Sequence, residues 1–395
     1  MSEPSFTPRQ RFEMDACTGC RLCADVCPAA CAAANGELTA VYRMQGLKRR
    51  LKAGRGLRRF FGPKPPGPQE LKRFAETVFR CTLCGRCAEV CPIGIRLQEL
   101  WHAARQDLVD GSAYPEKIDL IRRNLAESRN VFGEDNAERA EWVEDMRRPP
   151  KHGYIRETAE VAYITGCVAA YFPLAQKIPV ALAEIFDASG VDFTILGEEE
   201  WCCGFPLLGA GLMGMFEDFR RQNLRAVAAK GARTVVFACP SCYQMWREHY
   251  RCDLDLVSAP EYLLRLLRAG RVPLREVPLT VTYHDPCDLG RGARVFDPPR
   301  EAIRSIPGVT LVEMAHHRES CLCCGGGGNL EMVDPGLAAR IARDKVDEVL
   351  ATGAQAVVTS CQQCVRTMTA TVKRNKITLE VLDIVQLVRR ALKPA

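Results

Sequence analysis

Two runs of cysteines near the start of the chain share one spacing, and each run is followed directly by proline. Both runs match the pattern C-x2-C-x2-C-x3-C-P, in which three thiolates converge on one [4Fe–4S] cluster and the fourth ligates the other cluster. The first run is Cys17, Cys20, Cys23 and Cys27, and the second is Cys81, Cys84, Cys87 and Cys91. The spacing therefore predicts one cubane cluster on Cys17, Cys20, Cys23 and Cys91, and another on Cys81, Cys84, Cys87 and Cys27.

A pair of four-cysteine zinc sites is the alternative reading of these runs. Zinc motifs usually join two separated C-x2-C knuckles, whereas four cysteines within eleven residues crowd a single ion. The iron–sulfur interpretation is therefore favoured over zinc.

Ten further cysteines form two sets, each made of a lone cysteine, an adjacent pair and a C-x2-C. The first set is Cys167, Cys202, Cys203, Cys239 and Cys242, and the second is Cys287, Cys323, Cys324, Cys361 and Cys364. Five thiols exceed what a cubane or a zinc ion requires, and they suit an opened cluster in which one thiolate bridges two irons. Packing thiols with structural zinc are the alternative for these sets.

The elements around these cysteines also repeat, with an offset of 120 to 122 residues between matching cysteines. Short apolar runs, typical of buried strands, precede the cysteines, and helical patterns separate the runs. The predicted strands are 161–165, 192–196, 234–238, 279–283, 310–314 and 356–359; the predicted helices are 179–189, 215–230, 299–305 and 337–352. Alternating strands and helices predict parallel sheets, which bind ligands beyond the carboxyl ends of their strands, where these cysteines lie.

Composition limits the class of protein. The chain has 395 residues, 21 cysteines and 47% hydrophobic residues, so it can bury large cores and does not resemble a small secreted disulfide scaffold. The first eleven residues carry no apolar signal segment, and no uncharged apolar run is long enough to span a membrane. We expect a soluble protein of a reducing compartment, cytoplasmic, with membrane association only through a partner.

The whole cysteine pattern resembles that of heterodisulfide reductases, in the arrangement that fuses a ferredoxin-like subunit with a subunit carrying two cysteine-rich "CCG" domains. Two shorter segments also resemble this family, namely residues 283–287 and the glycine run Gly325–Gly328. Similar architecture occurs in the iron–sulfur subunits of glycolate, lactate and glycerol-3-phosphate dehydrogenases, but some of those lack cysteines of one motif, whereas both motifs are complete here. The resemblance implies that each five-cysteine set ligates a noncubane [4Fe–4S] cluster, and that a disulfide is cleaved between the two.

The resemblance also directs attention to polar residues near the ligands. His284 and His317 are the candidate proton donors, with a structural role as the alternative for each. Four arginines near ligand segments are candidates for holding an anionic substrate or stabilising anionic clusters: Arg291, Arg294, Arg318 and Arg366. The glycine run is predicted to let backbone amides approach sulfur. The three remaining cysteines, Cys31, Cys252 and Cys321, are predicted to be packing or spare thiols.

The sequence thus predicts an α-helical bicluster ferredoxin domain (1–110), a helical linker rather than a core (111–155), and two duplicated α/β, Rossmann-like CCG domains (156–275 and 276–395). We predict an oxidoreductase subunit that passes electrons from two cubane to two noncubane 4Fe-4S clusters and reduces a disulfide. The alternative is an electron relay within a larger dehydrogenase or flavin-based bifurcating complex. No flavin or nicotinamide motif is present, so the redox partner is predicted to be another subunit, such as a flavoprotein.

One charged segment is not explained by this pattern. Residues 43–73 contain eleven Lys or Arg and one acid, Glu70. A solvated basic loop is the favoured interpretation, and a docking surface for an acidic redox partner or an anionic membrane is the other. The net charge of +6 does not by itself indicate nucleic-acid binding.

Overall fold

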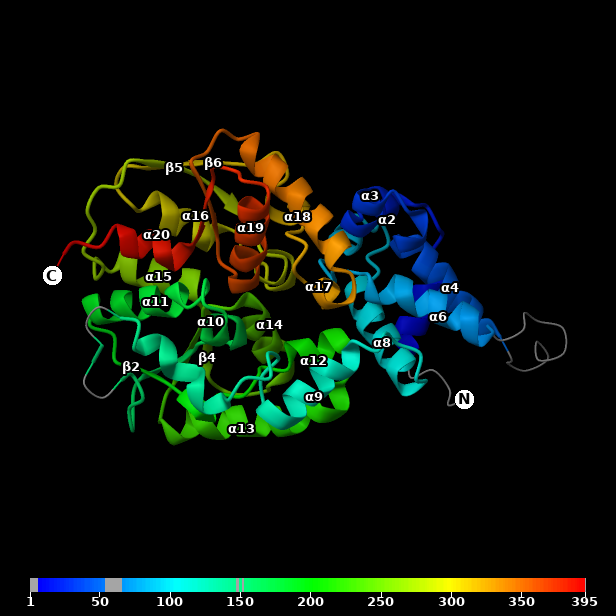
Figure 1. The fold of residues 1–395 in the computed structure, drawn as a ribbon, viewed down its shortest axis with the longest axis horizontal. Helices are drawn as coiled ribbons and strands as arrows, with labels where there is room; N and C mark the ends of the chain where they lie inside the picture. Colours follow the sequence, from blue (N-terminus) through cyan, green and yellow to red (C-terminus); the bar gives the residue numbers. More distant parts are fainter. Residues whose placement is uncertain (1–5, 54–65, 147–148, 151–152, 395) are drawn as a thin grey trace. The chain divides into compact units, whose positions relative to one another are not determined.

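A computed structural model describes residues 6–53, 66–146, 149–150 and 153–394. The chain divides into two compact units that interleave along the sequence. The helical unit comprises residues 1–122, 206–214 and 325–344, and the α/β unit comprises residues 123–205, 215–324 and 345–395. Both β-sheets lie in the α/β unit (Figure 1).

The helical unit is built from short helices around the two N-terminal cysteine runs. Its elements are α1 (Pro8–Ala16), α2 (Leu22–Asp25), α3 (Pro28–Ala33), η1 (Gly36–Leu38), α4 (Ala40–Lys52), α6 (Pro68–Phe79), α7 (Arg86–Glu89), α8 (Leu97–Asp110), η4 (Met213–Met215, ending just beyond the unit), α12 (Phe205–Ala210, beginning just before it) and α17 (Leu330–Val333). Two helices, α9 (Ile118–Ser128) and α18 (Pro335–Leu350), have residues in both units. Proline at the first turn of α3 and α6 suits a helix start, because that N–H has no helical partner.

The α/β unit contains two four-stranded sheets with the same strand order. The first sheet is β2-β1-β3-β4 and the second is β6-β5-β7-β8, and every strand pair is parallel. The strands are β1 (Val161–Ile164), β2 (Phe193–Ile195), β3 (Thr234–Phe237), β4 (Asp255–Ser258), β5 (Leu279–His284), β6 (Val309–Val312), β7 (Ala356–Thr359) and β8 (Glu380–Asp383). The predicted duplication of a parallel α/β domain is confirmed, and β4 and β8 are strands that the sequence patterns did not reveal.

Helices join the two repeats into one apolar core. The helices are α10 (Cys167–Tyr171), α11 (Lys177–Ala188), α13 (Phe216–Ala229), α14 (Pro240–His249), α15 (Ala259–Arg268), α16 (Asp297–Arg304), α19 (Gln362–Arg374) and α20 (Ile384–Arg390), with shorter turns η2 (Asn136–Val143), η3 (Gly197–Glu199), η5 (Asp288–Gly292) and η6 (Arg318–Ser320). Helix α11 packs against α20, and α15 against α16 (Figure 1). Buried side chains from both sheets, including Tyr163 and Tyr283, belong to the same hydrophobic cluster.

The segment 111–155 differs from the prediction of a linker without a core. It does contain helical elements, α9 and η2, but Ile121 and Leu125 of α9 are fully buried. Trp142, Met146 and Tyr154 belong to the hydrophobic cluster of the α/β unit. Most residues of the segment are polar, but its few large apolar side chains are buried. Their burial makes the segment part of the core.

Backbone packing within the helical unit explains two glycines of the run, Gly327 and Gly328, while the approach of backbone amides to sulfur stays a prediction. A Cβ atom at Gly328 would lie 2.4 Å from the Cys81 carbonyl oxygen, and one at Gly327 would lie 2.8 Å from the Thr82 carbonyl oxygen. Gly328 also has a φ of +64°, a backbone conformation that residues with a side chain rarely adopt. These glycines let the segment that follows Cys324 approach the second cysteine run of the ferredoxin part.

The described parts of the basic segment are mainly helical. Its first part lies on α4 and its last part on α6, while residues 54–65 lie outside the described residues. On α4, Arg43 is buried, Lys48 donates to the Cys17 carbonyl (2.8 Å), and Arg50 pairs with Asp107 (2.7 Å). The prediction of a solvated basic loop is therefore wrong for these three side chains. Within the described residues, none of the helices has the length and apolarity that a membrane crossing requires.

Candidate metal centres

The two cysteine runs of the helical unit interleave in space. One cavity is lined by Cys17, Cys20, Cys23 and Cys91, and another by Cys27, Cys81, Cys84 and Cys87. Each cavity therefore combines three cysteines of one run with the last cysteine of the other run. This is the arrangement that two cubane clusters with exchanged fourth ligands would occupy.

Burial makes some of these thiols costly to ionise. Burial, followed by the neighbouring Cys17, raises the pKa of Cys23 to about 11. Burial also raises the pKa of Cys87, and Cys81 and Cys84 raise it further. Thiolates crowded in this way require positive charge to remain together, which the iron of a bound cluster would supply.

The first five-cysteine set lies at the carboxyl edge of the first sheet. Cys167 follows β1 and Cys239 follows β3, the two central strands of that sheet, and all five cysteines of the set are buried. A hydrogen bond between the sulfurs of Cys167 and Cys202, together with burial, raises the pKa of Cys167, whereas hydrogen bonds from Cys202 and Cys242 lower the pKa of Cys203 to about 6. A hydrogen bond between Cys239 and Cys242 adds the fifth sulfur, so the five sulfurs form one connected group.

A buried ion pair beside this set was missed by the sequence analysis. Arg139 donates to Glu200 (Nη1 to Oε1, 2.8 Å) and to Cys167 (Nη2 to Sγ, 3.6 Å), and both charged side chains are almost fully buried. Glu200 also accepts from the backbone N–H groups of Thr165 and Gly166, each at 2.9 Å. The pair therefore fixes the turn that carries Cys167. Arg139 lies in the segment 111–155, far from any cysteine motif, so nothing in the sequence indicated its role.

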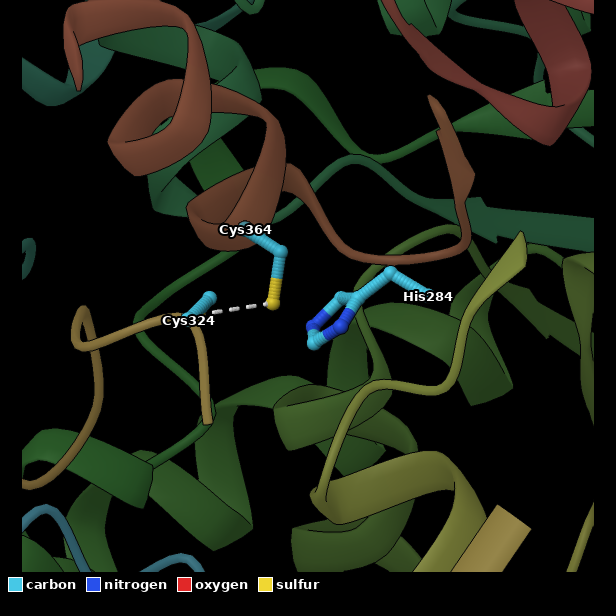
Figure 2. A group of neighbouring side chains, drawn as sticks. All are labelled: His284, Cys324 and Cys364. Carbon is cyan, nitrogen blue, oxygen red and sulfur yellow. Dashed lines mark hydrogen bonds between the residues drawn. The ribbon is translucent and has the colours of Figure 1, made fainter. Parts of the chain in front are cut away.

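The second five-cysteine set repeats this placement on the second sheet. Cys287 follows β5 and Cys361 follows β7, again the two central strands. Figure 2 shows Cys364 of α19 with its sulfur directed at Cys324, and the two sulfurs are 3.1 Å apart. His284, the last residue of β5, has a ring nitrogen within 4.8 Å of both sulfurs. Buried thiols grouped in this way can hold a metal or a cluster, with the His284 ring beside them.

The two sets lie close to each other within the α/β unit. Gln362, directly after Cys361, accepts from the Ala169 N–H (3.1 Å) and donates to the Thr165 carbonyl (2.7 Å), both beside Cys167. In a second contact between the repeats, the Ser241 hydroxyl donates to the Asp288 carboxylate (2.5 Å). Ser241 is adjacent to Cys242, and Asp288 is adjacent to Cys287. The hydrogen bonds therefore join ligand segments of one repeat to ligand segments of the other.

Cys321 is buried, as expected for a packing thiol, but its neighbours are polar. Its sulfur lies 3.4 Å from His284 Nδ1 and 3.5 Å from the amino group of Lys345. Burial alone would raise the pKa of Cys321, but the charge of Lys345, followed by that of His284, lowers it to about 7. Lys345 pairs with Glu348 (2.7 Å), which in turn contacts the half-exposed His316 (2.7 Å). A line of polar side chains thus runs from the surface to His284.

The other candidate residues have varied surroundings. His317 Nδ1 lies 2.9 Å from the Met314 carbonyl. Arg291 is buried and donates to the Cys321 carbonyl (2.9 Å), so it supports a ligand segment. Arg318 pairs with Asp297, Arg366 lies over the Phe172 ring, and Arg294 has a positive φ of 61°. Among the extra thiols, Cys31 is exposed and Cys252 partly buried, so burial does not explain Cys31.

Comparisons with known proteins agree with this organisation. A model of the 4Fe-4S dicluster domain matches residues 13–95, and a model of the CCG cysteine-rich domain matches residues 161–247 and 281–369. The chain is 34% identical to the D-type subunit of the dihydromethanophenazine:CoB–CoM heterodisulfide reductase of Methanosarcina mazei, over 98% of this chain and 96% of that protein. The chain belongs to this heterodisulfide reductase family. It is therefore an iron–sulfur electron-transfer protein with 4Fe–4S clusters, of a family whose named members are oxidoreductase subunits.

Two more distant comparisons extend this picture. The EtfAB:quinone oxidoreductase of Syntrophomonas wolfei is 25% identical over 81% of this chain, which corresponds to 47% of that protein. The crystal structure of a hypothetical protein from Helicobacter pylori matches 99% of this chain and 74% of that chain, with a TM-score of 0.56 and 13% identity. At that identity the match concerns the fold alone. The predicted family and fold class are confirmed.

Proposed function

We propose that this protein carries electrons from two cubane [4Fe–4S] clusters, on the two cysteine runs, to two noncubane [4Fe–4S] clusters, on the two five-cysteine sets, and reduces a disulfide there. The observation that carries the proposal is the proximity of two complete five-cysteine sets, joined by the hydrogen bonds of Gln362. A disulfide bound between them would have one sulfur beside each set. The reaction consumes two electrons and two protons, breaks one S–S bond and releases two thiols.

The clusters, when bound, supply the two electrons one at a time. The residues of the chain supply positions and protons. Arg139 and Glu200 hold the turn before Cys167, and Gln362 fixes the spacing between the sets. His284 is placed to hand a proton from its ring nitrogen to a sulfur leaving the bond, because it lies beside Cys324 and Cys364. The line through Cys321, Lys345, Glu348 and His316 would return that proton from the surface.

Replacing His284 tests its assignment as proton donor. We expect His284→Gln to lower disulfide turnover roughly a hundredfold, the lower end of the range for general acids, with cluster content unchanged. His317→Gln, at the other candidate, should have a much smaller effect, because His317 faces a carbonyl. The control is His249→Gln on α14, outside both cysteine sets. Equal losses in the His284 and His317 variants would contradict the assignment.

The proposal also includes the domain boundaries and the redox partner. The proposed functional domains are residues 1–110 for the cubane clusters and 156–275 and 276–395 for the noncubane clusters, while 111–155 contributes side chains to the core. A flavoprotein or another redox subunit would deliver the electrons, and any membrane association would come through such a partner. The second candidate function is a relay subunit of a larger dehydrogenase or flavin-based electron-bifurcating complex, with no small-molecule substrate of its own; one similar protein is named as an oxidoreductase between EtfAB and quinone.

Thiol trapping separates the reductase from the relay. The full chain, purified anaerobically and oxidised, would be mixed with a panel of thiols that includes those of CoM and CoB, the coenzymes in the relative's name. We expect a thiol-dependent paramagnetic signal, seen by electron paramagnetic resonance, that is absent from Cys324→Ala and kept by Cys252→Ala. Fast electron exchange with a flavoprotein, without any thiol-dependent signal, would overturn the reductase proposal in favour of the relay.

A further inference from the structure

The two candidate cubane sites differ in exposure although their ligand patterns are the same. At the first site Cys20 is exposed, and Cys17, Cys23 and Cys91 are partly buried. At the second site Cys27, Cys81 and Cys84 are buried, and only Cys87 is partly exposed. Here "first site" means the set with Cys17, and "second site" the set with Cys81.

The second site is bordered by a buried arginine of α4. Arg43 is 1% exposed and lines the cavity that holds Cys27 and Cys87. Its Nε donates to the Thr77 carbonyl (2.8 Å), while its Nη2 is buried without a hydrogen-bond partner among the described residues. Its charge favours the ionised form of both thiols. A buried cation with an unused donor requires an anion nearby.

A second buried arginine contacts the same cysteine run. Arg105 of α8 is fully buried, and its guanidinium donates only to backbone carbonyls among the described residues. The acceptors are those of Val78, Phe79, Cys81, Gly209 and Gly328. The 2.7 Å contact with the Cys81 carbonyl places this charge beside a ligand. Carbonyls satisfy its hydrogen bonds but do not neutralise its charge.

The first site has cations of a different kind. Arg21, which lines its cavity, is exposed, so water screens its charge. Lys48 is partly buried and donates to the Cys17 carbonyl. Neither side chain is a buried, uncompensated charge, so the two sites differ in electrostatics as well as in exposure.

We propose that Arg43 and Arg105 are the counter-ions of the cluster at the second site, and that they raise its reduction potential above that of the cluster at the first site. Reduction adds negative charge, which buried cations stabilise strongly because little water screens them. Burial alone would lower the reduction potential, but here it also strengthens the attraction of two guanidinium groups for the negative charge of the cluster. Within the helical unit, the electron would therefore rest at the second site. The inference depends on the proposed cubane clusters but not on disulfide reduction.

Redox titration of the full chain, followed by electron paramagnetic resonance, tests this order. In the wild type, the cubane of higher potential should be the one whose signal Cys20→Ser leaves unchanged. In Arg43→Gln we expect that cluster's oxidised-to-reduced ratio at fixed potential to rise about tenfold, which is a shift of about 59 mV for one electron. The other cubane should keep its potential, and Arg49→Gln, an exposed position on the same helix, should change neither.

Arg43→Lys keeps the proposal testable if the glutamine variant loses iron. A lysine retains the charge, so the potential in Arg43→Lys should stay closer to the wild-type value than in Arg43→Gln. If Arg43→Gln loses iron and gives no potential, the oxidised-to-reduced ratio in Arg43→Lys should lie within about a fivefold change of the wild-type ratio. An unchanged potential in Arg43→Gln with full iron would overturn the proposal, and so would an equal shift of both cubanes. A tenfold change in Arg43→Lys would also overturn it, because the hydrogen bond rather than the charge would then set the potential. A missing thiol signal in the trapping experiment would leave these potentials untouched, so the two proposals fail separately.

Discussion

Cys364→Ala is expected to abolish disulfide turnover and to remove about 4 of about 16 irons per chain, because it deletes one ligand of the second five-cysteine set. The Cys364 sulfur lies 3.1 Å from that of Cys324 and close to His284, at the centre of the group shown in Figure 2. Alanine leaves an apolar gap there and no thiolate to hold iron. The measurements are iron per chain and turnover with an artificial electron donor.

The matched control for this variant is Cys252→Ala. Cys252 is partly buried and belongs to neither five-cysteine set nor either cysteine run, so iron content and turnover should match the wild type. The cubane signals should survive in both variants, since their ligands lie in the helical unit. Full iron content and unimpaired turnover in Cys364→Ala would contradict the assignment of this cysteine.

Arg139→Met is expected to lower the free energy of unfolding by about 3–5 kcal/mol, because it leaves Glu200 charged, buried and unpaired. Both partners are at most 2% exposed, and Glu200 holds the backbone N–H groups ahead of Cys167. The measurement is urea denaturation under anaerobic conditions, with iron retention followed in parallel. We expect the iron of the first five-cysteine set to be lost before that of the others.

Two companion variants show whether the buried pair is responsible. Arg156→Met removes an ion pair whose partners are 54% and 48% exposed, so the change should be at most about 1 kcal/mol. Arg139→Met combined with Glu200→Met removes both buried charges and should recover part of the lost stability. A single Arg139→Met variant as stable as Arg156→Met would contradict the role given to the pair.

The sequence predicted most accurately those features that depend on local spacing. The cysteine runs, the two five-cysteine sets and the strands before Cys167, Cys239 and Cys361 could be read from short windows, because ligand geometry and strand periodicity are local properties. The strands β4 and β8 were not recognised. Each begins with an exposed acidic residue and buries only its last two residues, so the apolar pattern is too short to stand out.

Features that depend on distant contacts could not be predicted. Arg139 reaches Cys167 across 28 residues, and Lys345 reaches Cys321 across 24. Cationic residues are common in this chain, and no local pattern distinguishes the few that are buried. The same limit explains why the segments 206–214 and 325–344 were not assigned to the helical unit, since that assignment rests on tertiary contacts such as those of Gly328 and Arg105.

The proposed function requires four clusters in one chain. Anaerobic purification of the full chain, followed by quantification of iron, acid-labile sulfide and zinc, tests that claim in one measurement. Four [4Fe–4S] clusters predict about 16 irons and about 16 sulfides per chain, with no stoichiometric zinc. A chain that retains a few zinc ions and no iron would contradict both the reductase and the relay.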